Sequence, residues 1–212
     1  MTSNLKEEIL TPANIVTMVR IILIPVFVVV ILSPLPQWFP GHMLLAVFQP
    51  WIAAIVFAIL AATDGIDGYL ARSRNQVTDF GKFIDPLADK ILVCAALLAL
   101  IELDSLPSWI ALIILAREFI VSGLRMLAAS KGVVVAAAWP GKVKTVLQIL
   151  AIICFIVKNS FFIQVKSGWF ATAFFYFSWT LMIAAVVMTI ISMLDYFWKT
   201  KEVFKSNSGS NE

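Results

Sequence analysis

Long apolar runs alternate with short polar breaks along the whole chain. A membrane-spanning helix needs about 20 mostly apolar residues, and six runs meet this requirement. These runs cover residues 14–33, 44–72, 82–102, 107–130, 143–163 and 168–198. Proline, glycine and aspartate mark turns between them, at 34–41, at 104–107 and at Trp139-Pro140-Gly141. The pattern predicts an all-α integral membrane protein with six transmembrane helices.

The composition agrees with a membrane protein. Hydrophobic residues make up 61% of the chain and charged residues 14%, which is far from the average of soluble domains. The net charge of +3 is too small to indicate a nucleic-acid partner, and it suits a protein that faces anionic membrane lipids. Both cysteines, Cys94 and Cys154, lie inside apolar runs, so we expect no disulfide.

The distribution of basic residues predicts the orientation in the membrane. Lysine and arginine follow the second, fourth and sixth apolar runs, whereas the loops 34–43 and 103–106 contain none. The positive-inside rule then predicts that both termini and the loop after the second run are cytoplasmic. Lys158 and Lys166 disagree mildly, because the loop near them should lie outside.

The same pattern suggests a simple domain organisation. Residues 1–13 form a juxtamembrane segment, residues 14–200 form the membrane domain, and the polar tail 201–212 is expected to be disordered. No internal repeat is evident, which gives little support to a transporter built from inverted repeats.

Four aspartates lie together in the segment 63–90, with apolar sequence on both sides. They are Asp64, Asp67, Asp85 and Asp89. An ionised carboxylate near a bilayer costs several kcal/mol unless it is compensated. The members of each pair are three or four residues apart, so each pair shares one face of a helix. Two such helices side by side would gather four carboxylates, which predicts a site for divalent metal at the cytoplasmic end of the spans.

Residues around the aspartates add to this prediction. Gly68 and Ala71 lie on or near the face of the first pair and leave room for a ligand to approach the backbone. Arg72 supplies a cation for a phosphate at the same level. The alternative is a solvated cluster at a helix end, or carboxylates neutralised by Arg72, Lys82 and Lys90.

From Asp64 to Asp89 the motif is D-x-x-D-G-x-x-A-R, eight residues, then G-x-x-x-D-x-x-x-D. Here the chain resembles the CDP-alcohol phosphatidyltransferase family, whose signature is matched at every fixed position. The resemblance implies a cytidine diphosphate-linked lipid as donor, CMP as leaving group, and Mg²⁺ or Mn²⁺ as cofactor with two ions per active site. It also implies a homodimer.

The resemblance also implies roles for the four carboxylates. Asp64 and Asp85 would bridge the two metals, Asp67 would bind the first metal, and Asp89 would bind the second. Asp89 would also be the general base that acts on the acceptor hydroxyl.

The donor site is implied by the same resemblance. Contacts to the nucleotide and its diphosphate would come from Gly68, Arg72 and Thr78. Asn14 and Thr17, at the start of the first run, would close over the donor. Arg20, one turn further on, could meet a phosphate or cap the helix bundle.

Basic residues in the second half of the chain predict an acceptor with a phosphate. Arg117 and Arg125 are eight residues apart and share a helix face, and two arginines in one span are costly without a function. Lys142 and Lys144 open the fifth run, and this set suits a dianionic phosphate. The alternatives are pairing of the arginines with Glu118 or the aspartates, and membrane anchoring by the lysines.

The runs AREFIVSGLR (116–125) and GKVKT (141–145) resemble the bacterial branch of the family that uses glycerol 3-phosphate. The resemblance implies transfer of a phosphatidyl group from CDP-diacylglycerol to sn-glycerol 3-phosphate, which gives phosphatidylglycerophosphate and CMP. It implies a multi-pass protein of the bacterial cell membrane, whose polar active-site cavity faces the cytoplasm. A related enzyme that uses inositol phosphate or phosphatidylglycerol, and a divalent-cation transporter, are the alternatives.

Overall fold

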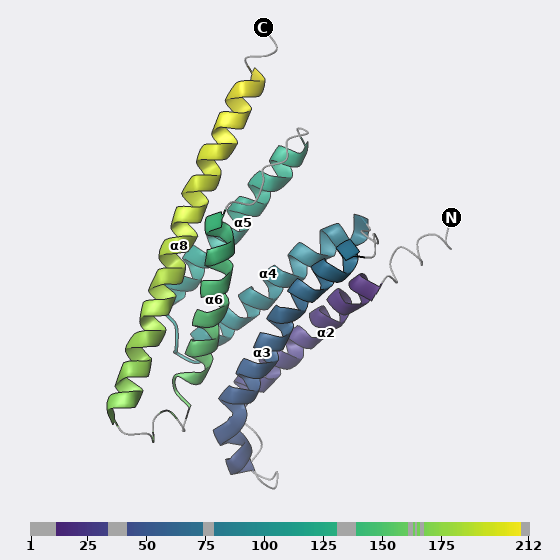
Figure 1. Cartoon of the computed structure of the whole chain (residues 1–212). Helices are drawn as coiled ribbons and strands as arrows, with labels where there is room; N and C mark the ends of the chain where they lie inside the picture. The colour runs from purple at the N-terminus through teal and green to yellow at the C-terminus, as the bar shows by residue number, and fades with distance from the viewer. Residues whose placement is uncertain are drawn as a thin grey trace. The chain divides into compact units, whose positions relative to one another are not determined.

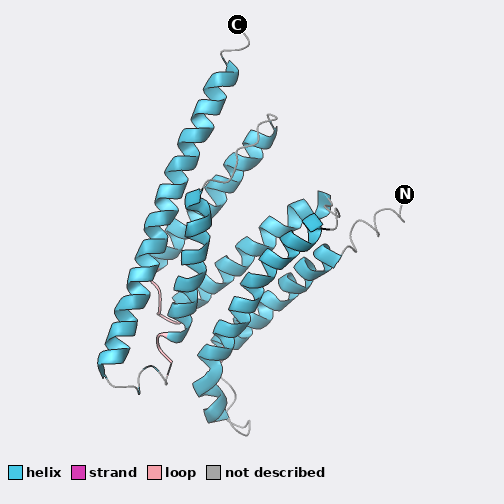
Figure 2. Ribbon diagram, in the orientation of Figure 1, coloured by secondary structure: helices cyan, strands magenta, loops and turns pink. Residues whose placement is uncertain are grey.

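The computed structural model describes residues 12–33, 42–73, 79–130, 139–160, 163, 165 and 168–208. Side chains are described in these ranges except at 12–13, 42–45, 64–73, 79–86, 129–130, 140 and 199–208. Every regular element in these ranges is an α-helix (Figures 1 and 2). The predicted all-α class is therefore confirmed.

Six helices form the regular structure of the described ranges, one for each predicted apolar run. They are α2 (Pro12–Leu32), α3 (His42–Ser73), α4 (Asp79–Glu102), α5 (Ser108–Ser130), α6 (Trp139–Val157) and α8 (Gly168–Ser208). The division at residues 13 and 200 stays a prediction, although α8 itself continues to Ser208.

Both ends of α6 differ from the predicted run 143–163. Trp139-Pro140-Gly141 is the first turn of this helix, so the predicted turn there was wrong. Proline lacks a backbone N–H and has a helical φ, which makes it as suitable for the first turn of a helix as for a loop. α6 also ends at Val157, six residues before the predicted end of the run.

The distribution of apolar and polar side chains is that of a membrane protein. Segments long and apolar enough to cross a membrane occur at Asn14–Leu32, Ala46–Thr63 and Gly168–Trp198 within the described ranges. Large apolar side chains face outward, as at Ile22, which is 69% exposed, whereas Arg20 is 1% exposed. Charged side chains inside and apolar ones outside suit a lipid environment. Six crossings and a cytoplasmic site remain predictions.

The chain folds as two compact units, which are described separately. Unit 1 comprises Met1–Leu106 and Ile153–Ala171, and unit 2 comprises Pro107–Ile152 and Thr172–Glu212. In unit 1, α2 packs against α3 and α4, and α3 also contacts α4. Unit 2 contains α5, the first part of α6 and nearly all of α8.

The C-terminal end of α2 is tied to the N-terminal part of α3. Gln49 Nε2 donates hydrogen bonds to the carbonyl oxygens of Val30 (2.9 Å), Ile31 (3.3 Å) and Ser33 (3.2 Å). The last carbonyl groups of a helix have no partner within the helix, so Gln49 satisfies part of this need. The two helices therefore run antiparallel in unit 1.

The end of α4 confirms the predicted turn at 104–107. Asp104 has a φ of 50°, a left-handed conformation that often terminates helices. The backbone N–H groups of Ser105 and Leu106 both donate to Leu100 O. The buried Lys158 Nζ donates to Ser105 O at 2.7 Å, which holds the segment after α6 against this turn.

In unit 2, α8 presents a buried stripe that contains hydroxyl groups. Its members recur every three or four residues, as expected of one helix face. They are Ser178, Met182, Ala185, Thr189, Ser192 and Tyr196. A helix that only anchors the protein in lipid would not need polar groups on its buried face, so these groups indicate polar contacts with other parts of the protein.

Candidate active site

The two aspartate pairs lie on neighbouring helices at matching heights. Asp64 and Asp67 belong to α3, and Asp85 and Asp89 belong to α4. Asp67 and Asp85 each lie six residues from the helix end at the short connection between α3 and α4, and Asp64 and Asp89 lie nine and ten residues from it. The helices contact each other. Because a helix rises equally per residue, the pairs are level with one another.

This arrangement is compatible with the predicted metal site. Carboxylates on adjacent helices at one level are the oxygen ligands that Mg²⁺ and Mn²⁺ prefer. The side chain of Asp89 is half-buried, and those of Asp64, Asp67 and Asp85 lie outside the described part. Among side chains that are described, no group of three or more His, Cys, Asp or Glu could hold a metal ion. The metal site stays a prediction.

Polar residues of α2 lie level with the aspartates of α3. Asn14, Thr17 and Arg20 are 2%, 0% and 1% exposed, and their spacing of three places them on one side of α2. The contacts of Gln49 with the end of α2, and the Phe27–Phe57 ring contact at 5.7 Å, fix the antiparallel register. Counting back along α2 from these contacts places Asn14 and Thr17 beside about residues 62–70 of α3.

The remaining donor-site predictions fall partly outside the described part. Gly68 and Arg72 lie in α3, one and two turns after Asp64. The side chain of Arg72 and all of Thr78 are not described. The predicted contacts of these residues with the nucleotide therefore stay predictions.

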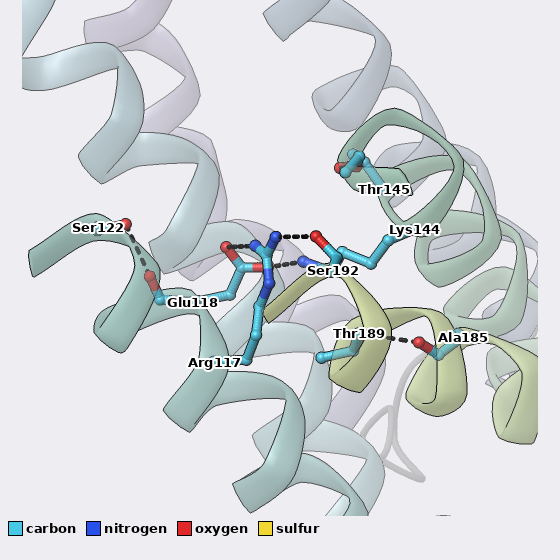
Figure 3. Close-up of polar contacts among 9 residues, drawn as sticks. Arg117, Glu118, Ser122, Lys144, Thr145, Ala185, Thr189 and Ser192 are labelled. Atoms are coloured by element: carbon cyan, nitrogen blue, oxygen red, sulfur yellow. Dashed lines mark hydrogen bonds and ion pairs between the residues drawn. The ribbon is translucent and has the colours of Figure 1, made fainter. Parts of the chain in front are cut away.

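In unit 2, a buried charge cluster joins three helices (Figure 3). The Glu118 carboxylate of α5 forms ion pairs with Lys144 Nζ of α6 and with Arg117 Nη1, the latter at 3.6 Å. Arg117 Nη2 donates to Ser192 Oγ of α8 at 2.6 Å. Exposed fractions of the side chains are 9% for Arg117, 3% for Lys144 and 16% for Glu118. Pairing with Glu118 was the alternative to phosphate binding, and the structure contains it.

The four predicted acceptor residues do not all join this cluster. Lys142 is exposed and lies two residues from Lys144, hence about 200° around the helix from it. Arg125 is also exposed, and its Cζ lies 5.5 Å from the ring centroid of Tyr196. Arg117 and Lys144 therefore form the centre of the cluster, with Arg125 two turns from Arg117 on α5.

The region around Arg117 and Lys144 has a net positive charge. Arg117, Arg125 and Lys144 carry three positive charges and Glu118 carries one negative charge, so the net charge is +2. A dianion would neutralise this excess charge, and guanidinium and ammonium groups bind phosphate oxygens well.

Sequence reasoning missed three polar residues around the cluster. Ser192 and Tyr196 of α8 contact the two arginines. Gln148, one turn after Lys144, is 3% exposed, and its Oε1 has no hydrogen-bond partner among the described residues. The spacing of Ser192 and Tyr196 from Thr189, which places all three on one face of α8, is the sequence feature that could have indicated them.

The chain matches a family model and several bacterial proteins along most of its length. The model described as CDP-alcohol phosphatidyltransferase matches residues 10–191. The chain therefore belongs to the CDP-alcohol phosphatidyltransferase family, as the motif predicted. It is 41% identical over 199 residues to the CDP-diacylglycerol–glycerol-3-phosphate 3-phosphatidyltransferase of Bacillus subtilis (strain 168), covering 92% of this chain and 97% of that protein. The protein of the same name from Escherichia coli (strain K12) is 36% identical over 188 residues, covering 86% and 91%.

Proposed function

We propose that this chain transfers the phosphatidyl group of CDP-diacylglycerol to sn-glycerol 3-phosphate, which gives phosphatidylglycerophosphate and CMP. Two relatives that match along most of both chains have this reaction in their names. The observation that supports this acceptor most directly is the buried cluster of Arg117, Glu118 and Lys144, with Arg125 nearby. With Arg125 included, the net charge of this region is +2, which matches the charge of a phosphate dianion.

On the donor side, four carboxylates would hold two Mg²⁺ or Mn²⁺ ions. They are Asp64, Asp67, Asp85 and Asp89. Such ions, when bound, neutralise the diphosphate and the charge that develops on the leaving oxygen. Asn14 and Thr17 would contact the donor from α2, together with Gly68, Arg72 and Thr78.

The chemistry of the transfer needs one base and firm positioning of the acceptor. Asp89 would take the proton from the 1-hydroxyl of glycerol 3-phosphate. The hydroxyl oxygen then forms a bond to the phosphorus that carries diacylglycerol, while the bond from that phosphorus to the CMP oxygen breaks. Arg117 and Lys144 would hold the acceptor phosphate during this step, because a fixed acceptor lowers the entropic part of the barrier.

The setting of the reaction is also part of the proposal. The excess of lysine and arginine after the second, fourth and sixth apolar runs supports a multi-pass protein whose active site faces the cytoplasm of a bacterial cell. CDP-diacylglycerol would enter from the membrane and glycerol 3-phosphate from the cytoplasm. The family resemblance supports a homodimer.

A related enzyme with another alcohol is the nearest alternative. Inositol phosphate also carries a dianionic phosphate, so the charge cluster alone does not distinguish it from glycerol 3-phosphate. Phosphatidylglycerol carries no such dianion, and the charge of +2 disfavours it. A divalent-cation transporter would use the aspartates without releasing CMP.

The proposal is tested by CMP release from purified protein with CDP-diacylglycerol and Mg²⁺. We expect release with glycerol 3-phosphate, and not with inositol phosphate or phosphatidylglycerol. Asp89→Asn should lower the rate by roughly 10²–10⁴-fold, as the loss of a general base does. Asp104→Asn is the matched control, because Asp104 is exposed and its left-handed conformation also suits asparagine. Release with another alcohol only would overturn the proposed acceptor.

A further inference from the structure

The hydroxyl group of Ser192 behaves differently from those of Ser178, Thr180 and Thr189 along α8. Ser178, Thr180 and Thr189 each donate to the carbonyl oxygen four residues earlier, at 2.7–2.8 Å. This is the usual local bond of a serine or threonine inside a helix. Ser192 instead accepts a hydrogen bond from Arg117 Nη2 at 2.6 Å, across the helix interface. The side chain of Ser192 therefore bonds to α5 rather than to the backbone of α8.

The position of Ser192 is fixed by its surroundings. It is 5% exposed, and a Cβ atom on Gly141 of α6 would lie 3.7 Å from Ser192 Oγ. The start of α6 therefore lies close to this hydroxyl, at ordinary van der Waals distance. Ser192 therefore lies where α5, α6 and α8 meet, beside the pair formed by Glu118 and Lys144 (Figure 3).

Tyr196 makes a comparable contact one turn later on α8. It is 4% exposed, and its ring faces the guanidinium of Arg125 at 5.5 Å, within the range of a cation–π interaction. Ser192 and Tyr196 are four residues apart and share a face of α8, as Arg117 and Arg125 share a face of α5. One face of α8 therefore contacts both arginines.

The chemistry of these two contacts differs from that of an ion pair. Glu118 holds Arg117 and Lys144 with a negative charge, which cancels part of their attraction for an anion. A hydroxyl oxygen and an aromatic ring fix a guanidinium without cancelling its charge. α8 can therefore orient both arginines and leave their positive charge available to a phosphate.

We infer that Ser192 and Tyr196 are positioning residues that hold Arg117 and Arg125 in the geometry that binds the acceptor phosphate. This inference rests on the proposed function, and it adds α8 to an acceptor site that the sequence assigned to α5 and α6. The two residues act through the arginines and do not touch the reacting atoms.

The test is a comparison of KM values in purified full-length variants. Ser192→Ala should raise the KM for glycerol 3-phosphate roughly tenfold, as expected for a lost hydrogen bond to a charged group. The KM for CDP-diacylglycerol and kcat should change little, and Ser192→Thr, which retains the hydroxyl, should restore most of the affinity. Thr189→Val is the matched control, because the bond that the structure describes for this buried hydroxyl goes to the backbone of its own helix.

A second pair of variants tests Tyr196. Tyr196→Leu removes the ring and should raise the KM for glycerol 3-phosphate several-fold, whereas Tyr196→Phe retains the ring and should raise it less. The rise in thermal midpoint on adding inorganic phosphate is measured on all variants, so the test does not depend on turnover. We expect Ser192→Ala to reduce this rise and Thr189→Val to leave it unchanged.

Two results would overturn the inference. One is a Ser192→Ala protein with the KM and phosphate response of Thr189→Val. The other is an equal loss for both substrates, which would indicate a purely structural role. If wild-type protein instead releases CMP only with another phosphorylated alcohol, the proposed acceptor fails, and the same comparison with that alcohol decides the role of Ser192.

Discussion

Replacing Glu118 by glutamine should destabilise the substrate-free protein strongly. The Glu118 side chain is 16% exposed and is shared by Arg117 and Lys144, which are 9% and 3% exposed. Removing one partner of a buried ion pair typically costs about 3–5 kcal/mol, because it leaves an uncompensated buried charge. At about 2–4 °C per kcal/mol for a chain of this size, the thermal midpoint should fall by roughly 6–20 °C.

Thermal unfolding in detergent can be followed with a thiol-reactive fluorescent dye. The two cysteines, Cys94 and Cys154, are free and partly buried, so unfolding exposes them to the dye. Glu102→Gln is the matched control, since Glu102 is an exposed carboxylate at the end of α4. Inorganic phosphate should raise the midpoint of Glu118→Gln more than that of the wild type, because it supplies the missing negative charge.

Two results would refute this reasoning. If Glu118→Gln melts at the temperature of Glu102→Gln, the carboxylate does not compensate the buried cations. If phosphate stabilises the variant and the wild type equally, the anion does not bind at Arg117 and Lys144, and the proposed acceptor site is wrong.

Three further predictions address other parts of the protein. Gln49→Leu removes the hydrogen-bond donor for carbonyl groups at the end of α2. It should therefore lower the free energy of unfolding by about 1–3 kcal/mol, and with it the thermal midpoint, while both KM values stay the same. A changed KM would contradict a structural role. Asn14→Ala and Thr17→Val should raise the KM for CDP-diacylglycerol only, and an effect on glycerol 3-phosphate alone would refute their place in the donor site. Chelation of divalent metal should stop CMP release and added Mg²⁺ should restore it, because four carboxylates gathered at one level favour a bound divalent ion. Undiminished activity in chelator would exclude the metal site.

The sequence predicted the helical class and the family well, because both depend on strong local patterns. Each apolar run has its helix, and the spacing from Asp64 to Asp89 alone was enough to indicate the family. The prediction of a turn at 139–141 was wrong, because proline is common both in loops and at the start of helices.

The acceptor cluster was harder to predict, because its contacts join distant segments. The local sequence does not distinguish Lys142 from Lys144. Lys144 is buried and Lys142 is exposed because they lie on different faces of α6. Arg117 and Ser192 are 75 residues apart, and α8 is apolar around most of its circumference, so a serine there resembles a packing residue. Such partners emerge only when the helices are assembled.

The central claim is that this chain joins a phosphatidyl group to glycerol 3-phosphate. The most direct test follows radiolabelled sn-glycerol 3-phosphate and CMP together, with purified protein, CDP-diacylglycerol and Mg²⁺. The account predicts that label enters the chloroform-extractable lipid in equal amount to the CMP released, and that Asp89→Asn lowers both rates by roughly 10²–10⁴-fold. CMP release while the label stays water-soluble would indicate hydrolysis or another acceptor, and would contradict the account.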